Sequence, residues 1–462
     1  ATRTLILNLT GGVRSSAVFH ASGDKALNPW GLLENRGGLR LGAVLGDAIS
    51  DPRLSPSGRP ETPVGDASYT PEGWDGLTMP RIHEMSDRFS VLGTWNEGRG
   101  DHVTSQIEES TGGSRADPGL LTRVNMALSS VEEPAVPPFS VNGSVGVFFS
   151  GAPGATVRHA PVEIATPYEL PGNALTPGSL LDRVGGRWNQ NDTMHARLDQ
   201  TRIARTRGQA QVLAQAHAAT RRNHRRLGSQ LGQAWVDPGN ADASFGNARL
   251  GDRTVPLTNA MLATVFQAPL SDPAVGQYGD DYLYDAANLA FAVRLLQLGA
   301  PMVVVELGQF DQHAEERQRG PARYRTLARY WSALEWLLGR MEEPTDARQS
   351  MLDRTLVMTT SEFGRDPGNA ATGFNDGDGT DHGTHASCFY LGHAVMGAGV
   401  TGGRVLGGVE TNGAAAFNAR QQADRYGTRD LMATVLYALG LDHKSEAWGF
   451  PFGASPITGL WG

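Results

Sequence analysis

The stretch RTLVMTTSEFGR, residues 354–365, decides the fold because it joins a strand directly to a polar loop. Residues 354–360 are apolar and β-branched over the length of one strand. Glu362 and Arg365 follow immediately, at the carboxyl end where open α/β sheets keep their ligands. The pattern predicts a buried strand that delivers these two side chains to a site.

The same arrangement occurs earlier in the chain. The apolar run MVVVEL at 302–307 ends in GQFDQH, which places Asp311 and His313 on the following loop. A third run, TLILNL at 4–9, breaks at a glycine pair, as a central parallel strand does before a site loop. Helical patterns at 282–299 and 322–339 lie on either side of the 302–307 strand. Alternating strands and helices predict an α/β fold with a mostly parallel sheet sandwiched between helices.

The remaining elements are expected as follows. Further strands are predicted at 144–149 and 388–393, and a helix at 428–440 with Thr428 as its N-cap and Gly440 as its stop. The Gly- and Pro-rich part from about 20 to 140 is expected to be dominated by loops, with short helices near 38–48 and 101–110. We expect a single domain, 1–462, with a loop-rich insertion at about 50–140 and an Arg-rich helical insertion at about 177–235.

Six residues of metal-binding type lie on two of the strand-end loops. Carboxylates and imidazoles in such positions suit Zn²⁺ or Mn²⁺. Taken singly, each is more often a solvated side chain, and the group on strand ends is what favours metal binding. The run DGDG at 376–379 is treated as solvated, since it lacks the spacing of a calcium loop. The six residues are Asp311, His313, Glu362, Asp381, His382 and His385.

Composition excludes several classes of protein. The 462 residues carry a formal net charge of −8, which gives no support to general nucleic-acid binding. Cys388 is the single cysteine, so there is no disulfide framework and no thiolate zinc cluster. No apolar run reaches the length of a transmembrane helix. The chain begins at Ala1 without Met, which fits either a removed leader or a cloning scar.

The segment 194–234 is strongly basic, with eight arginines against one acid, Asp199. A surface that contacts phosphate groups is one interpretation. A solvated helix pair that contacts an acidic neighbour is the commoner case, so we expect an interface with a protein partner or a second copy.

Several motifs together resemble the bacterial family called domain of unknown function 1501, which is placed in the alkaline phosphatase superfamily. The resemblance spans nearly the whole chain, and the order and spacing of the motifs make it specific. They are NLTGG near the start, FDQH, SEFGR, GTDHG with a following His, GAGVTGGRVLG at 397–407 and DLMATVLYALGLD at the end.

The resemblance implies a two-metal hydrolase core that acts on phosphate or sulfate esters. On that basis Asp311, His313 and His385 would hold one ion, and Asp381 and His382 the other. His102 and Arg365 are expected as acid/base and anion-holding groups. Members of the family commonly carry export leaders, which implies a periplasmic or extracellular location.

Two positions depart from the family's pattern. Arg14 stands where an Asp usually completes the second metal site, and Asp101 stands at the usual nucleophile position. A guanidinium strongly disfavours a divalent cation at that place. We therefore expect one ion rather than two, with Arg14 paired to Asp101 and Asp381 instead.

Two functions remain open from the sequence. One is an exported metal-dependent hydrolase with an altered or impaired active site that acts on a small anionic ester. The other is a catalytically inactive structural or assembly subunit that uses the same fold as a scaffold. Since function lies in the site and not in the fold, the fold alone does not separate them.

Overall fold

The computed structural model describes residues 3–14, 19, 33–36, 39–42, 69–95, 102–112, 117–131, 136–142, 161–164, 241–269, 281–308, 310–311, 313, 316–365, 368–369, 371–375, 379, 390–407, 426–450 and 453–462. The predicted strand at 144–149 and the Arg-rich segment at 177–235 lie outside these residues. None of the helices described here is long and apolar enough to cross a membrane.

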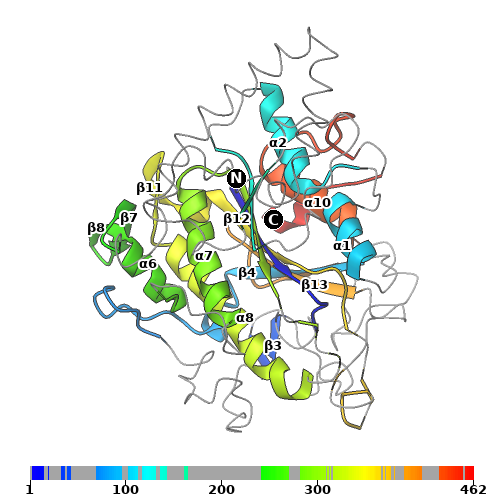
Figure 1. The fold of residues 1–462 in the computed structure, drawn as a ribbon, viewed down its shortest axis with the longest axis horizontal. Helices are drawn as coiled ribbons and strands as arrows, with labels where there is room; N and C mark the ends of the chain where they lie inside the picture. Colours follow the sequence, from blue (N-terminus) through cyan, green and yellow to red (C-terminus); the bar gives the residue numbers. More distant parts are fainter. Residues whose placement is uncertain are drawn as a thin grey trace, which may run out of the picture.

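A mixed, mostly parallel sheet forms the centre of the molecule (Figure 1). Its strands lie in the order β14, β4, β13, β12, β1, β9, β5, β6, and β15 also pairs with β4. They are β1 (Arg3–Leu9), β4 (Phe89–Trp95), β5 (Phe139–Val141), β6 (Val162–Ile164), β9 (Met302–Leu307), β12 (Thr355–Thr360), β13 (Tyr390–Met396), β14 (Val405–Leu406) and β15 (Tyr426–Gly427). The expected α/β class with a mostly parallel sheet is confirmed.

Strand β1 lies between β12 and β9 and runs parallel to both. Leu5 and Leu7 face one hydrophobic cluster, which includes residues of the helices α6 (Asn259–Phe266), α7 (Asp281–Gln297) and α8 (Glu316–Leu338). Ile6 faces the second cluster, with residues of α2 (Leu120–Val131) and α10 (Thr428–Ala438). Because both faces of the strand are covered, its sequence is continuously apolar.

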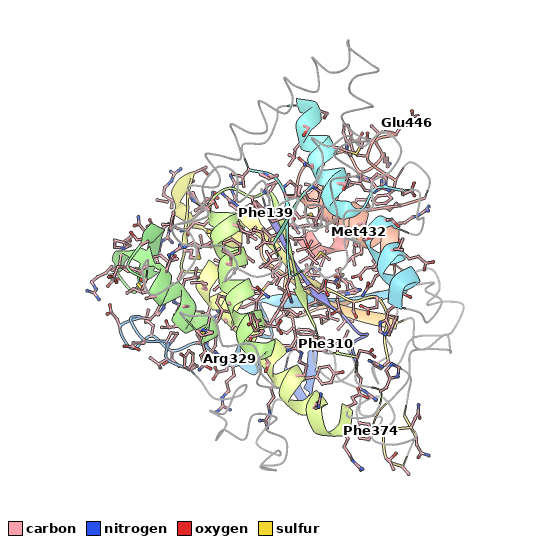
Figure 2. All side chains as sticks on the ribbon, in the orientation of Figure 1. Phe139, Phe310, Arg329, Phe374, Met432 and Glu446 are labelled. Atoms are coloured by element: carbon pink, nitrogen blue, oxygen red, sulfur yellow. The ribbon has the colours of Figure 1, made fainter. Side chains whose placement is uncertain are left out.

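Figure 2 shows side chains filling both sides of the sheet; Met432 of α10 is labelled on one of them.

The smaller elements lie outside the sheet. They are β2 (Leu33–Arg36) paired with β3 (Leu39–Gly42), β7 (Ser244–Leu250) paired with β8 (Arg253–Thr258), β10 (Glu342–Glu343) paired with β11 (Asp346–Ser350), the helices α1 (His102–Thr111) and α9 (Met351–Arg354), and the 3-10 helices η4 (Ile82–Met85) and η10 (Thr458–Trp461).

Several local predictions are wrong. The expected helix at 38–48 is a strand where it is described, since β3 pairs with β2. The part expected to be loops contains β4, α2 and β5. Strand β13 runs antiparallel to β12, so parallel pairing stops there.

The predicted helix at 428–440 is correct, but Gly427 is its N-cap rather than Thr428. The reason is that Asp430 accepts a hydrogen bond from the Gly427 N–H at 2.9 Å, which caps the helix from its third residue. Gly440 follows the last helical turn with φ of 73°, as expected of a helix stop.

Candidate metal centre

Three site loops meet at one edge of the sheet because β12, β1 and β9 are parallel neighbours. Strand β1 leads into Gly11 and Gly12, β9 into Asp311, and β12 into Glu362. Gly11 has φ of +104°, and a Cβ there would lie 2.1 Å from the backbone N of Asp311. Only glycine allows this close approach of the first two loops.

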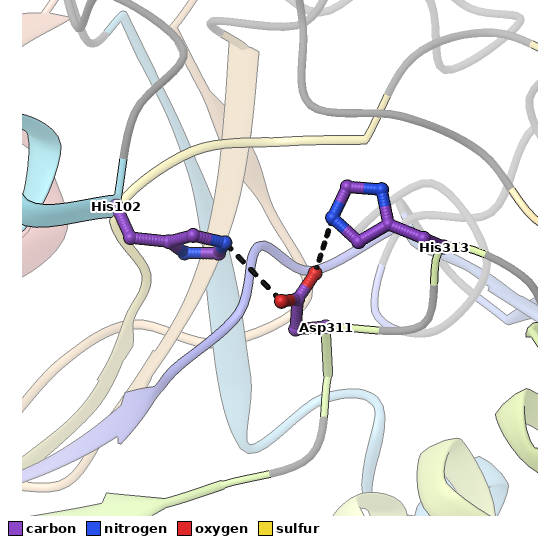
Figure 3. Close-up of side chains that lie close together, drawn as sticks. All are labelled: His102, Asp311 and His313. Atoms are coloured by element: carbon purple, nitrogen blue, oxygen red, sulfur yellow. Dashed lines mark ion pairs between the residues drawn. The ribbon is translucent and has the colours of Figure 1, made fainter.

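Asp311 lies between two imidazole rings (Figure 3). Its Oδ1 is 2.9 Å from Nε2 of His313, and its Oδ2 is 3.2 Å from Nε2 of His102, the first residue of α1. One ligand atom from each of the three residues lies within 4.8 Å of the others. The side chains of Asp311 and His313 are almost half exposed, and that of His102 is one-third exposed. The cluster therefore opens to solvent on the side of His313.

Glu362 orients His102 from the side of the ring opposite Asp311. Its Oε1 lies 2.9 Å from Nδ1 of His102 and accepts a hydrogen bond from the Gly11 N–H at 2.7 Å. The Glu362 side chain is fully buried. This carboxylate holds one ring nitrogen of His102, so that the other nitrogen, Nε2, faces Asp311. Glu362 was predicted as a metal ligand, and its geometry is that of a carboxylate that orients a ligand.

The two carboxylates also change the protonation of His102. Hydrogen bonds with Asp311 and then Glu362 are the largest causes that raise the pKa of His102, to about 9, and burial opposes them. The raised pKa favours the protonated form of the ring beside its two acidic partners. His102 was expected to act in acid/base chemistry, and a ring that holds a proton at neutral pH is compatible with that prediction.

Arg365 joins the loops beneath the cluster. Its Nη2 lies 2.7 Å from Oδ1 of Asp311, 2.6 Å from the carbonyl oxygen of Gly11 and 2.8 Å from that of Phe310. Its Nε donates to the carbonyl oxygen of Gly12 at 3.1 Å. The side chain is 1% exposed. Arg365 was predicted to hold a substrate anion, but its guanidinium is buried and engaged by the protein, which gives it a positioning role.

Arg14 makes a two-pronged ion pair with Glu316, the first residue of α8. Nε lies 2.8 Å from Oε1 and Nη2 lies 2.8 Å from Oε2, and both side chains are 2% exposed. The Arg14 guanidinium also lies over the ring of Phe374, 5.8 Å from its centroid. The partner described for Arg14 is thus Glu316, and the expected pairing with Asp101 and Asp381 involves two residues outside the described part.

A family comparison accounts for most of the chain. The model of a family described as "Protein of unknown function (DUF1501)" matches residues 77–455. The chain belongs to the DUF1501 family. No curated protein matches it. A solved structure titled "Crystal structure of Ps i-CgsB in complex with k-i-k-neocarrahexaose" is similar with a TM-score of 0.36 and 8% identity, over 99% of this chain and 75% of that one.

The structure of this DUF1501 chain brings together part of the predicted site. Asp311 and His313 meet as expected, and His102 joins them as a third candidate ligand. The other predicted residues, Asp101, Asp381, His382 and His385, lie outside the described residues. Their roles therefore stay predictions.

Sequence reasoning missed two residues of this DUF1501 chain near the site. Glu316 was hidden because its partner Arg14 is 302 positions away in sequence. Glu109, on α1, is 2% exposed, although a Glu-Glu pair in a helix ordinarily indicates a solvated face. The signal available was its spacing, since it comes seven residues after His102 and therefore lies on the same side of the helix.

Proposed function

We propose that this chain is a metal-dependent hydrolase of phosphate or sulfate esters, with an alkaline-phosphatase-like fold and an altered active site. The observation that carries the proposal is the convergence within 4.8 Å of His102, the first residue of α1, with Asp311 and His313, which follow the parallel strand β9. Three protein ligands on an exposed edge leave further coordination positions for a substrate or water, as catalytic sites do.

The chemistry of the donor set fits one divalent ion. Two imidazole nitrogens and one carboxylate suit Zn²⁺ or Mn²⁺. When bound, such an ion polarises an ester oxygen and lowers the pKa of a bound hydroxyl group. A single ion is favoured because Arg14, at the position expected for a second ion's ligand, is a buried cation paired with Glu316.

The residues around the ion would divide the work. Glu362 orients His102, and Arg365 holds Asp311 against the loops of β1 and β9. Asp381, His382 and His385 are proposed as further ligands, and Asp101 as a residue of the nucleophile position, from the family resemblance. The substrate class is a small anionic ester, and the proposed location is periplasmic or extracellular.

A second function is a catalytically inactive scaffold, with the Arg-rich segment 194–234 as an interface. The observation that favours it is that the cluster neutralises itself. His102 lies between Asp311 and Glu362 with a raised pKa, and Arg365 is ion-paired with Asp311. Each carboxylate of the cluster thus has a cationic partner within the protein.

Metal content and turnover of aryl esters together separate the two functions. Protein purified without chelator or affinity metal is analysed for metal and assayed on aryl phosphates and aryl sulfates, beside Asp311→Asn and the control Asp346→Asn, whose carboxylate lies on β11. A hydrolase contains about one ion per chain and turns over an ester, and Asp311→Asn loses both. Absence of both in the wild type contradicts the hydrolase and favours the scaffold.

A further inference from the structure

Helix α8 carries two adjacent buried residues, Arg323 and Tyr324, that contact the loop leading to Asp311. The ring of Tyr324 packs against that of Phe310, the residue before Asp311, with the ring centroids 5.8 Å apart. Arg323 comes seven residues, about two helical turns, after Glu316, which pairs with the loop of β1. One side of α8 therefore contacts the site loops of both β1 and β9.

Arg323 binds the loop of β9 at two points. Its Nη2 donates a hydrogen bond to the carbonyl oxygen of Gly308, the first residue after β9. Its guanidinium also lies over the ring of Phe310, 5.0 Å from the centroid. These two contacts hold the backbone where the loop begins and the side chain that directly precedes Asp311.

Asp285 of α7 fixes Arg323 in this place. Oδ2 of Asp285 lies 2.8 Å from Nη1 of Arg323, and the side chains are 4% and 2% exposed respectively. A buried guanidinium needs such a partner, because an unpaired charge in the interior is strongly unfavourable. The ion pair thus joins α7 and α8 to the end of β9.

Arg365 holds the same loop from the side of β12. Its Nη2 donates to the carbonyl oxygen of Phe310 and to Oδ1 of Asp311. The Phe310 N–H donates in turn to the carbonyl oxygen of Thr10 at 3.2 Å. Two buried arginines from different elements therefore hold the loop, and Arg323 acts on the residues that come before the candidate ligand.

We propose that Arg323 is a positioning residue for Asp311. By holding Gly308 and Phe310, it sets the place of the Asp311 carboxylate between the two imidazole rings. Such control matters because the side chains of a metal site must be held within about 0.5 Å of the productive geometry. The role rests on the proposed function, since Asp311 is the central ligand of the proposed metal centre.

The first test is amide hydrogen exchange of Arg323→Lys in the presence of chelator. Lysine keeps a charge for Asp285 but lacks the planar fork that also reaches Gly308 and covers Phe310. The Phe310 N–H should be protected in the wild type. In the variant it should exchange about tenfold faster, as expected for the loss of one hydrogen bond that holds the loop.

Arg294→Lys, on α7, is the matched control. Arg294 is as buried as Arg323, but its guanidinium binds the side chain of Asn259 and the carbonyl oxygen of Leu257, away from the site loops. The Asn259 N–H donates to the carbonyl oxygen of Ala243 at 2.9 Å, so its exchange reports on that region.

The two variants should act on different amides. We expect Arg323→Lys to accelerate exchange at Phe310 but not at Asn259, and Arg294→Lys to do the reverse. If Arg323→Lys accelerates both amides equally, or leaves Phe310 unchanged, Arg323 does not position the loop. An unprotected Phe310 N–H in the wild type overturns the proposal without any variant.

The second test is zinc affinity, measured by competition with a zinc-binding dye. Arg323→Lys should bind zinc about tenfold more weakly than the wild type, as is typical when a residue that supports a ligand is changed. Arg294→Lys should bind zinc as the wild type does. An unchanged affinity in Arg323→Lys overturns the positioning role.

The two tests separate this role from the proposed function. A wild type that binds no zinc contradicts the metal centre, whereas the exchange test still decides whether Arg323 holds the loop. If Arg323→Lys does not fold, Asp285→Asn takes its place, because it removes the partner that fixes the guanidinium. Unchanged exchange at Phe310 in Asp285→Asn then overturns the proposal.

Discussion

Arg365 and His313 share one oxygen of Asp311. The guanidinium Nη2 lies 2.7 Å from Oδ1, and the imidazole Nε2 lies 2.9 Å from the same atom. The guanidinium is buried and the imidazole is almost half exposed. Asp311 is therefore held from the protein side and remains accessible from the solvent side, which is how a carboxylate is prepared to receive a ligand.

Arg365→Lys should destabilise the protein. Lysine keeps the charge but not the planar fork, so the bonds to Gly12 and at least one other carbonyl are lost and leave buried acceptors unsatisfied. We expect a loss of about 2–4 kcal/mol in urea unfolding. The control is Arg348→Lys on β11, where the side chain is 91% exposed and a change within about 0.5 kcal/mol is expected. Equal losses of stability in the two variants would contradict the role of Arg365 in holding the site loops together.

Glu362→Gln should weaken metal binding without removing a ligand. The amide has no negative charge to hold Nδ1 of His102, and loss of such a partner typically lowers metal affinity about 10–100-fold. Competition with a zinc-binding dye measures the change. Glu342→Gln, on β10, is the control and should leave the affinity unchanged. An unchanged affinity in Glu362→Gln would show that His102 needs no orientation by this carboxylate.

Glu109→Gln should stabilise the protein at alkaline pH. The ordinary pKa of a Glu is 4.5 and that of Glu109 in the folded protein is about 8. Between these values the folded state binds more protons than the unfolded state, so stability falls as the pH rises through that window. Glu109 changes the free energy of unfolding by about 5 kcal/mol at most over this pH range, since each pKa unit corresponds to about 1.4 kcal/mol. Urea unfolding of the wild type and of Glu109→Gln measures the effect at pH 4.5 and pH 8. The variant should have the higher free energy of unfolding relative to the wild type at pH 8 but not at pH 4.5.

His393 should make the protein less stable as the pH falls, the opposite direction to Glu109. It lies buried in β13, and burial lowers its pKa from 6.5 to about 4, while its interaction with the Thr359 backbone opposes that shift. From pH 6.5 down to 4 the unfolded state binds the additional proton, so stability falls as the pH falls. His393→Gln should reduce this acid sensitivity by about 3 kcal/mol, measured by urea unfolding at pH 4 and pH 7. An identical pH dependence in both proteins would contradict the assignment.

The sequence predicted the parts of the fold that depend on local pattern. Strands β1, β9 and β12 are continuously apolar because helices cover both faces of the sheet, so they could be predicted from the sequence. The loops that bear Asp311 and Glu362 could then be placed at their ends. Strand β4 was missed. It lies in a Gly- and Pro-rich part of the chain, and its antiparallel partner β13 is about 300 residues away.

The sequence predicted which residues belong to the site better than it predicted how they contact one another. Strand ends placed Asp311, His313 and Glu362 at one edge, but local pattern does not show that Glu362 turns inward to Gly11 and His102. The pairing of Arg14 with Glu316 likewise depends on how β1 and α8 pack, which no stretch of sequence encodes alone.

The most direct test of the metal centre is anomalous diffraction at the zinc edge from crystals grown with zinc. The account predicts one strong peak at about 2.0–2.2 Å from Nε2 of His102, a carboxylate oxygen of Asp311 and Nε2 of His313, with Glu362 still on Nδ1 of His102. No peak there, with Asp311 still between the two rings, would contradict the metal centre and leave the three residues as an ion-paired cluster.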